Sequence, residues 1–269
     1  MRIIVTGGNS GVGKATAAAL ANEGHSVVIA CRSLEKAERA AAEMSGDVDV
    51  AALDLANLAS VRAFADSVES VDVLVNNAGV MNLPLMRTAD GFETHMGTNH
   101  LGHFALTCLL DDKITDRVIS VASAMYHFAR IHFDDLNWQG RRYSRTAAYS
   151  ESKLANLLFV QELASRGVRA YATDPGMTDT GITRGIAADM PMAERIPVWR
   201  FLHTAEQGAR ATLQAVTADL PSGTYLAPRF NQWGKPRVTR LRKKARDPVA
   251  AHRLWELSAE LTGCDWPNR

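Results

Sequence analysis

Short apolar segments alternate with longer amphipathic segments along most of this chain. The amphipathic segments have the spacing of helices that bury one face, and uninterrupted apolar segments of strand length are typical of a parallel sheet covered on both sides. The segments with strand character are residues 2–6, 26–31, 48–53, 72–75, 116–122, 168–174 and 223–226. This alternation predicts an α/β fold, a doubly wound parallel sheet with helices on both faces.

Length and composition narrow the class of protein. The 269 residues would allow two domains, yet no linker, repeat or composition break divides them, so we expect a single domain over 1–269. No apolar stretch approaches the roughly 20 residues that span a bilayer, and a first strand at residue 2 leaves no room for a signal peptide. Three cysteines without metal-ligand spacing indicate reduced thiols. We therefore expect a cytoplasmic protein without a metal, a membrane span or a nucleic-acid partner.

A glycine-rich turn follows the first apolar segment and precedes a helical stretch that begins at about Val12. Glycine lets the backbone approach a pyrophosphate, and the free amides and dipole of a helix N-terminus favour its negative charge. A glycine cluster elsewhere is often an ordinary tight turn, but a strand before it and a helix after it favour a dinucleotide site. The residues expected to line this site are Gly7, Asn9, Ser10, Gly11, Val12 and Gly13.

Tyr149 and Lys153 lie four residues apart in a segment of helical spacing. Side chains at this spacing share one helix face, about 5–6 Å apart at Cβ. A tyrosine with a pKa of about 10 needs a shift of about 3 units, or roughly 4 kcal/mol, to exchange protons near pH 7. A cation about 4 Å away supplies roughly that much at an effective dielectric constant of 20. The pair is a candidate acid–base centre, although alone it would also describe a surface tyrosine beside a solvated lysine.

The order of motifs along the chain adds to these two features. The turn reads Thr-Gly-x-x-x-Gly-x-Gly from Thr6 to Gly13, and with Tyr149-x-x-x-Lys153 it resembles the short-chain dehydrogenase/reductase family. The stretches IACRS at 29–33, SKLANLLFVQEL at 152–163 and HRLWELSAELTG at 252–263 are similar to the retinol dehydrogenase-like branch of that family. Further family motifs occur in order as Asp54-Leu55, Asn76-Asn77-Ala78-Gly79, Asn99, Ser123, Pro175-Gly176 and Thr180.

The resemblance implies a Rossmann-type fold and hydride transfer between a nicotinamide cofactor and an alcohol or carbonyl substrate. Tyr149 would exchange the proton, Ser123 would hydrogen-bond the reacting oxygen, and Lys153 would favour the tyrosinate and bind the cofactor ribose. Asn99 would hold a water that links Lys153 to solvent. The residues around the cofactor would be Asp54 and Leu55 at the adenine, Asn76, Ala78 and Gly79 on the adenosine side, and Pro175, Gly176 and Thr180 at the nicotinamide.

Two positions depart from the family pattern. Ala122 stands where a serine usually precedes the position of Ser123, and only the second of the two positions is required by the resemblance. Asp174 stands where the branch often has a histidine before Pro-Gly. The sequence alone offers no physical account of that aspartate.

The end of the second strand bears on the choice of cofactor. NAD sites usually carry an acid here for the ribose 2′-hydroxyl, whereas an arginine suits the 2′-phosphate of NADP. This chain has Cys31, Arg32 and Ser33 at the corresponding place, and no acid to repel a phosphate. We therefore expect NADP(H), with Arg32 and Ser33 near the phosphate. The alternative is an arginine that stacks on adenine without selecting the cofactor.

Three regions outside these motifs invite interpretation. Residues 177–204 form a long, methionine-rich connection, which predicts either a lid over a lipophilic substrate or short helices packed on the sheet. Residues 229–246 carry eight Lys/Arg and no acid, in a chain of net charge +1. They indicate either a contact for phosphates or anionic lipids or, as we favour, a solvated segment. Asp247-Pro248 and Gly263 predict the start and end of a final helix.

Three functions stay open at this level. The leading interpretation is an NADP(H)-dependent carbonyl reductase or alcohol dehydrogenase for a small, lipophilic molecule, assembled as a homodimer or homotetramer through the helices that contain Asn99 and Tyr149. An NAD(H)-dependent epimerase or dehydratase is the alternative among enzymes, but such relatives tend to have a larger C-terminal region. A catalytically silent nucleotide-binding regulator is the third, although such proteins typically lose the tyrosine or the lysine. We interpret the histidines, including His100 and His103, as structural.

Overall fold

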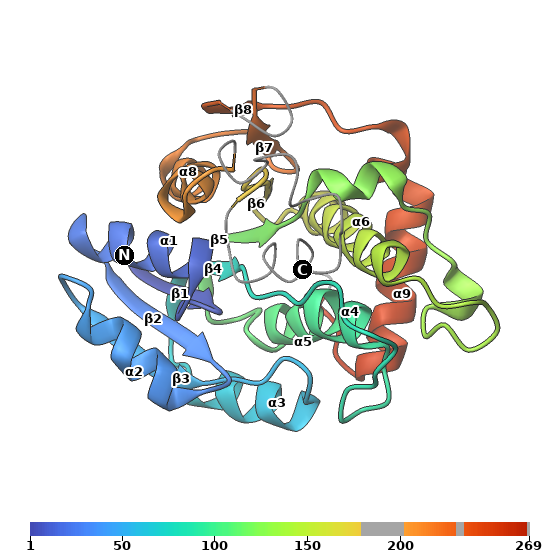
Figure 1. The fold of residues 1–269 in the computed structure, drawn as a ribbon, viewed down its shortest axis with the longest axis horizontal. Helices are drawn as coiled ribbons and strands as arrows, with labels where there is room; N and C mark the ends of the chain where they lie inside the picture. Colours follow the sequence, from blue (N-terminus) through green and yellow to red (C-terminus); the bar gives the residue numbers. More distant parts are fainter. Residues whose placement is uncertain (179–201, 230–233, 268–269) are drawn as a thin grey trace, which may run out of the picture.

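The computed structural model describes residues 1–178, 202–229 and 234–267, and its centre is one eight-stranded sheet (Figure 1). The strand order is β3-β2-β1-β4-β5-β6-β7-β8. Neighbouring strands from β3 to β7 are parallel, and β8 pairs antiparallel with β7. The strands are β1 (Arg2–Thr6), β2 (Ser26–Cys31), β3 (Val48–Ala52), β4 (Val71–Asn76), β5 (Ile114–Val121), β6 (Ala170–Thr173), β7 (Tyr225–Pro228) and β8 (Pro236–Val238). The predicted doubly wound fold is confirmed. The pattern missed β8, because a three-residue edge strand that starts at a proline carries little apolar signal.

Helices cover both faces of this sheet. Alternate residues of each strand face opposite sides, so Ile3 and Val5 belong to one apolar cluster and Ile4 to the other. One cluster includes residues of α1 (Gly11–Asn22), α2 (Leu34–Ala42) and α8 (Ala205–Thr217). The other includes residues of α3 (Leu58–Ser67), α5 (Gly102–Leu109), α6 (Arg145–Ser165) and α9 (Pro248–Thr262). The shorter helices are α4 (Thr94–Met96), the π-helix η1 (Gly97–Leu101) and the 3₁₀-helices η2 (Ala124–Phe128), η3 (Phe133–Asp135) and η5 (Lys243–Ala245).

The final helix begins and ends where its capping residues predict. Asp247 accepts from the amides of Val249 and Ala250, Pro248 occupies the first turn, and Gly263 closes α9 in the left-handed conformation with a φ of 63°. Figure 1 shows α9 beside α5 and α6. There Trp255 stacks on Phe159 with ring centroids 5.8 Å apart.

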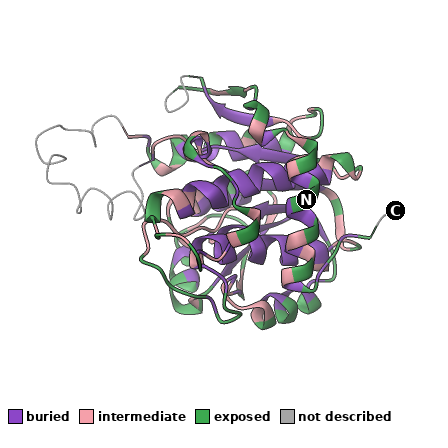
Figure 2. Cartoon of the chain, turned by 90° about the vertical axis from the view of Figure 1, so that its right-hand side faces the viewer, coloured by how far each residue is buried: buried purple, intermediate pink, exposed green. Residues whose placement is uncertain are grey.

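This position of α9 bears on the expected oligomer. His100 lies in η1, directly before α5, and its Nε2 is 2.9 Å from Oγ of Ser258 in α9. Figure 2 colours long stretches of the helices beside the sheet as buried. In α6 every residue from Ser150 to Val160 is buried. Part of the surface of the helices that contain Asn99 and Tyr149 is therefore covered by α9 of the same chain. The homodimer or homotetramer expected through those helices stays a prediction.

The order of the strands in the sheet predicts the edge at which a ligand binds. From β1 the order runs outward to β2 and β3 on one side and to β4 and β5 on the other. Ligands of open α/β sheets bind at such a switch point, outside the carboxyl ends of the strands. Because all described strands join one sheet, we propose that residues 1–269 form one domain. In the described ranges, no helix has both the length and the apolar character needed to cross a membrane.

Candidate active site

The glycine-rich turn lies between the carboxyl end of β1 and the N-terminus of α1. Gly7 and Gly11 have φ of 67° and 53°, a region that favours glycine. A Cβ on Gly13 would lie 2.5 Å from the carbonyl oxygen of Gly7, so a side chain there would force α1 away from the turn. Ser10 is the N-cap of α1 but its side chain makes no capping hydrogen bond. The first amides of α1 are thus left for an anion. The turn residues that remain at least partly exposed are Gly7, Asn9, Ser10, Gly11 and Val12.

Thr6, the last residue of β1, fixes the turn that follows β4. Its hydroxyl oxygen accepts from the amides of Asn77 and Ala78, each at 2.9 Å. The same oxygen lies 2.9 Å from Nε2 of His103, whose Nδ1 is 3.0 Å from the carbonyl oxygen of Asn99. Burial lowers the pKa of His103 to about 4, so the ring is neutral at pH 7 and donates through Nδ1 while Nε2 accepts from Thr6. His103 is structural, as expected, but it joins two segments that the sequence could not connect.

Ser123, Tyr149 and Lys153 come together at the carboxyl end of β5. Ser123 is the N-cap of η2, and its Oγ accepts from the amide of Met125 at 3.3 Å. The buried Nζ of Lys153 donates to the carbonyl oxygen of Val121 at 2.9 Å and lies 5.7 Å from the ring centroid of Tyr149. Asn156 donates to the same carbonyl at 3.2 Å. A serine and a lysine that are 30 positions apart in the sequence thus flank one phenol.

The electrostatics of this group differ from the sequence-based expectation. Burial raises the pKa of Tyr149; a hydrogen bond with Ser123 opposes the rise, and the charge of Asp174 adds to it. Burial lowers the pKa of Lys153 to about 8, with Asp174 opposing. Lys153 was expected to lower the pKa of the phenol, but the largest effect on that pKa is desolvation, which raises it. Tyr149 is therefore protonated at pH 7, the form that donates a proton.

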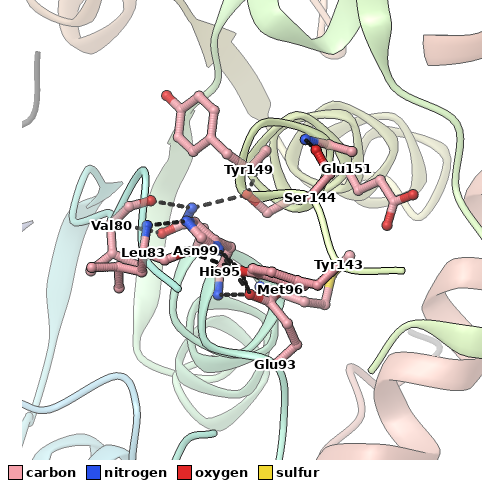
Figure 3. A network of polar contacts seen from close by, with 12 residues as sticks. Val80, Leu83, Glu93, His95, Met96, Asn99, Tyr143, Ser144, Tyr149 and Glu151 are labelled. Carbon is pink, nitrogen blue, oxygen red and sulfur yellow. Dashed lines mark hydrogen bonds and ion pairs between the residues drawn. The ribbon is translucent and has the colours of Figure 1, made fainter. Parts of the chain in front are cut away.

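Asn99 acts as a clamp between the turn after β4 and helix α6 (Figure 3). Its Oδ1 accepts from the amide of Val80 at 2.7 Å, and its Nδ2 donates to the carbonyl of Val80 at 3.0 Å and to Oγ of Ser152 at 2.9 Å. Ser152 in turn donates to the carbonyl of Tyr149 at 2.7 Å. Both amide hydrogens of Asn99 are used in these contacts, and the water expected at Asn99 stays a prediction. A Cβ on Gly79 would lie 3.3 Å from Oδ1 of Asn99 and 3.6 Å from Nζ of Lys153, which places that glycine at the same centre.

The buried carboxylate of Glu93 contacts a histidine, His95, that packs against Tyr149. Oε1 of Glu93 is 2.8 Å from Nδ1 of His95 and accepts from the hydroxyl of Tyr143 at 2.9 Å. The His95 ring packs edge-on against the Tyr149 ring, with centroids 6.3 Å apart (Figure 3). Glu93 and His95 are fully buried, and hydrogen bonds to the carboxylate lower the pKa of Glu93 against the effect of its burial. Sequence reasoning missed this group, because its members have no motif spacing and meet only when α4 and the loop before α6 come together.

Asp174 now has a physical account. Its Oδ1 accepts from the amide of Gly176 and its Oδ2 from the hydroxyl of Tyr225, both at 2.8 Å. The side chain is buried, which raises the pKa of Asp174, while these hydrogen bonds and the charge of Lys153 oppose the rise. The aspartate thus fixes the turn after β6 and sets the field around Lys153 and Tyr149.

The residues expected to select the cofactor lie at the end of β2. Cys31 is buried; burial raises the pKa of its thiol, and hydrogen bonds from backbone amides of the glycine-rich turn oppose that rise. Arg32 is exposed. Ser33 is the N-cap of α2, where its Oγ accepts from the amide of Lys36 at 3.5 Å. Arg32 therefore presents an exposed guanidinium at this place, and the partly exposed Ser33 keeps its hydroxyl proton.

The other predicted positions divide into two kinds. Leu55 and Asn76 are buried, and Nδ2 of Asn76 donates to the hydroxyl of Thr107 at 3.0 Å. Asp54 caps its own turn by accepting from the amide of Ala56 at 3.0 Å. The positions that stay at least partly exposed along this edge are Asp54, Ala78, Gly79, Pro175 and Gly176.

The connection after β6 is described only at its two ends. Thr178 forms a bridge with His203, whose amide donates to the carbonyl of Met177 at 2.7 Å. Thr180 and most of the expected lid at 177–204 lie outside the described residues. Cys31, Cys108 and Cys264 are free and buried. Within the described ranges, no group of three His, Cys, Asp or Glu side chains is arranged to hold a metal ion.

Comparison with known proteins decides the family. The family model described as short chain dehydrogenase matches residues 1–134. Human retinol dehydrogenase 12 is 41% identical over 288 residues, which cover 98% of this chain and 87% of the relative. The chain belongs to the short-chain dehydrogenase/reductase family. It falls in the retinol dehydrogenase-like branch, as the motifs at 29–33, 152–163 and 252–263 indicated.

Solved structures agree with this membership of the short-chain dehydrogenase/reductase family. An uncharacterized protein from Mycobacterium paratuberculosis has a TM-score of 0.87 and 44% identity, over 99% of this chain and 94% of that one. A protein from Beutenbergia cavernae, described as an NAD(P)-dependent gluconate 5-dehydrogenase with bound NADP at low occupancy, has a TM-score of 0.59 and 26% identity over 80% of this chain and 88% of that one. The family assigns the chain to oxidoreductases that transfer hydride with a nicotinamide cofactor.

Proposed function

We propose that this protein is an NADP(H)-dependent oxidoreductase that interconverts a lipophilic alcohol and its carbonyl compound, with Tyr149 as the acid–base residue. The observation that carries the proposal is the meeting of Ser123, Tyr149 and Lys153 at the end of β5, at the same sheet edge as an uncapped helix N-terminus. A nucleotide sensor would need the second feature but not the first. Three cysteines, all free and buried, support a reducing compartment such as the cytoplasm.

The residues of the glycine-rich turn fit a dinucleotide. Gly13 leaves no room for a Cβ between α1 and Gly7, and the amides at the start of α1 have no side-chain cap. These groups would hold the pyrophosphate, and Lys153, beside Gly79, would reach the nicotinamide ribose. Bound NADPH supplies the hydride. Arg32 would bind the 2′-phosphate, since no acid stands at the end of β2 and the guanidinium is exposed. The NADP bound by the Beutenbergia cavernae relative supports this choice.

The chain's own residues account for the proton in the reduction of a carbonyl group. Tyr149 starts protonated, because burial raises its pKa, and it donates to the oxygen that gains negative charge. Ser123 hydrogen-bonds the same oxygen and holds it in place. Lys153, which is largely protonated below its pKa of about 8, stabilises the tyrosinate that results. The hydrogen bonds of Asn99 and Ser152 hold α6 against the turn after β4.

A panel of carbonyl compounds tests the proposal. Purified protein should oxidise NADPH, followed by its absorbance, in the presence of a lipophilic aldehyde such as retinal, the probe that the retinol dehydrogenase relatives suggest. Small polar aldehydes and ketones, and the corresponding alcohols with NADP⁺, complete the panel. An enzyme that is inert with all of them in both directions while it binds NADPH is the silent regulator instead.

Asp174→Asn is expected to move the pH dependence of carbonyl reduction. The negative charge of Asp174 raises the pKa of both Tyr149 and Lys153, so its removal lowers both. Reduction needs both groups protonated, so it is lost as pH rises through the lower of the two pKa values, that of Lys153 at about 8. The alkaline limb of kcat/KM should therefore shift to lower pH, by roughly one unit for about 1.4 kcal/mol of interaction. The exposed Asp112→Asn serves as the control, and an unshifted limb in the Asp174 variant would rule out this role.

A further inference from the structure

A cavity of about 220 Å³ lies beside the proposed reaction centre, between η2, β7 and the segment that follows β8. Tyr126 and Tyr225 form its aromatic walls, with rings edge-to-face at a centroid distance of 6.1 Å. Thr239, Arg240 and Arg242 complete the other side. The cavity therefore combines a flat apolar surface with two guanidinium groups, which is a composition suited to a small molecule with one charged end.

The two arginines have no acidic partner in the part of the chain that the structure describes. Across residues 1–178, 202–229 and 234–267, neither Arg240 nor Arg242 forms an ion pair. Lys244 of the same basic segment is used differently, since its Nζ donates to the carbonyls of His127 and Ala129 at 2.8 and 2.7 Å. The basic segment at 229–246 is thus not uniformly solvated, because three of its residues line a cavity and Lys244 anchors η2.

His127 also lines the cavity. Its ring lies against the Tyr126 ring at a centroid distance of 4.1 Å. Burial lowers the pKa of His127, and the charges of Arg242 and Lys244 add to that effect. Two cations therefore act on a residue of the cavity wall, which favours an anion there.

The side chain of Asp174 links the cavity to the reaction centre. Tyr225 donates its hydroxyl proton to Oδ2 of Asp174, and the amide of Ala124, another lining residue, also bonds the Asp174 carboxylate. Asp174 in turn acts on Lys153 and Tyr149. The Asp174 charge also reaches the cavity, since it raises the pKa values of the lining residues Tyr126 and Tyr225. An anion therefore binds only where the two arginines outweigh that charge.

We propose that this cavity is a binding site for the anionic group, a carboxylate or a phosphate, of a small molecule. Arg240 and Arg242 would bind the charge, and the two tyrosines would contact an apolar or aromatic body. The site is separate from the glycine-rich turn and does not depend on which cofactor the enzyme uses.

Calorimetric titration with benzoate tests the site directly, with neutral benzamide as the isostere of the probe. Benzoate should bind, and the Arg240→Gln/Arg242→Gln double variant should weaken it by about tenfold, because the two arginines are exposed and their charge is partly screened. Arg237→Gln, an exposed arginine of the same segment outside the cavity, should leave binding unchanged. Equal binding of benzoate and benzamide, or equal loss in the double variant and the control, would overturn the proposal.

Kinetics then identify the source of the anion. If the anion is part of the substrate, an ω-oxo carboxylate of suitable length should be reduced with a higher kcat/KM than its methyl ester, the double variant should abolish the difference, and benzoate should inhibit competitively. If the anion is a separate effector, benzoate should change kcat without competing with the aldehyde. Both results support the site. Because titration needs no turnover, a failure of the proposed catalytic function would leave the binding result intact, and an absence of benzoate binding would refute the site alone.

Discussion

Tyr149→Phe should reduce kcat for carbonyl reduction by about 10²–10⁴-fold, the contribution that a positioned acid–base group usually makes. The substitution removes one hydroxyl and keeps the ring against His95 and near Lys153. The NADPH-binding residues are untouched, so affinity for NADPH measured by fluorescence titration should stay nearly constant. Stopped-flow measurement of a single turnover would show that the chemical step, and not product release, has slowed.

Tyr171→Phe is the matched control for this substitution. Tyr171 is buried, whereas Tyr149 is partly exposed. The Tyr171 hydroxyl donates to the carbonyl of Leu220 at 2.8 Å, in the apolar cluster that includes α1 and α8. The control should lose about 1 kcal/mol of stability and little activity. Lys153→Ala should differ from both by weakening NADPH binding and turnover together. A Tyr149→Phe enzyme that kept more than about a tenth of the wild-type rate would contradict the assignment.

Arg32→Ala should weaken NADPH binding roughly 10- to 150-fold and leave NADH binding nearly unchanged, since charge-assisted hydrogen bonds contribute about 1.5–3 kcal/mol. The exposure of Arg32 places the expected value toward the lower end of that range. Adding Cys31→Asp should shift the preference further toward NADH, because the new carboxylate would repel a 2′-phosphate. Since the Cys31 thiol lies against the glycine-rich turn, the single Arg32 variant is the cleaner test.

Arg39→Ala supplies the control for cofactor choice. Arg39 is exposed on α2, close in sequence to Arg32, and its side chain pairs with Glu35 at 2.7 Å. Its loss should change neither cofactor's affinity, because exposed pairs of this kind contribute little. Wild-type protein that bound NADH as tightly as NADPH would refute the assignment to NADP(H).

The sequence by itself was enough for the fold and for the family. Apolar runs of strand length mark elements that pair within one sheet, and their local signal does not depend on distant residues. The caps of α9 are equally local, since Asp247, Pro248 and Gly263 act within one helical turn. The motifs around Tyr149 and the glycine-rich turn identified the short-chain dehydrogenase/reductase family for the same reason: their chemistry depends on short spacing.

Contacts between distant segments decided the rest. The pKa of Tyr149 follows from its burial, which no spacing along α6 reveals. Asp174 gained a role only once β6 and β7 placed Tyr225 beside it, and Asn99 became a clamp only when the turn after β4 met α6. α9 covers the helices expected to pair with a second copy because the C-terminal segment folds back over α5 and α6. Local patterns determine elements and motifs, whereas burial, pKa values and free surfaces depend on which elements the tertiary structure brings into contact.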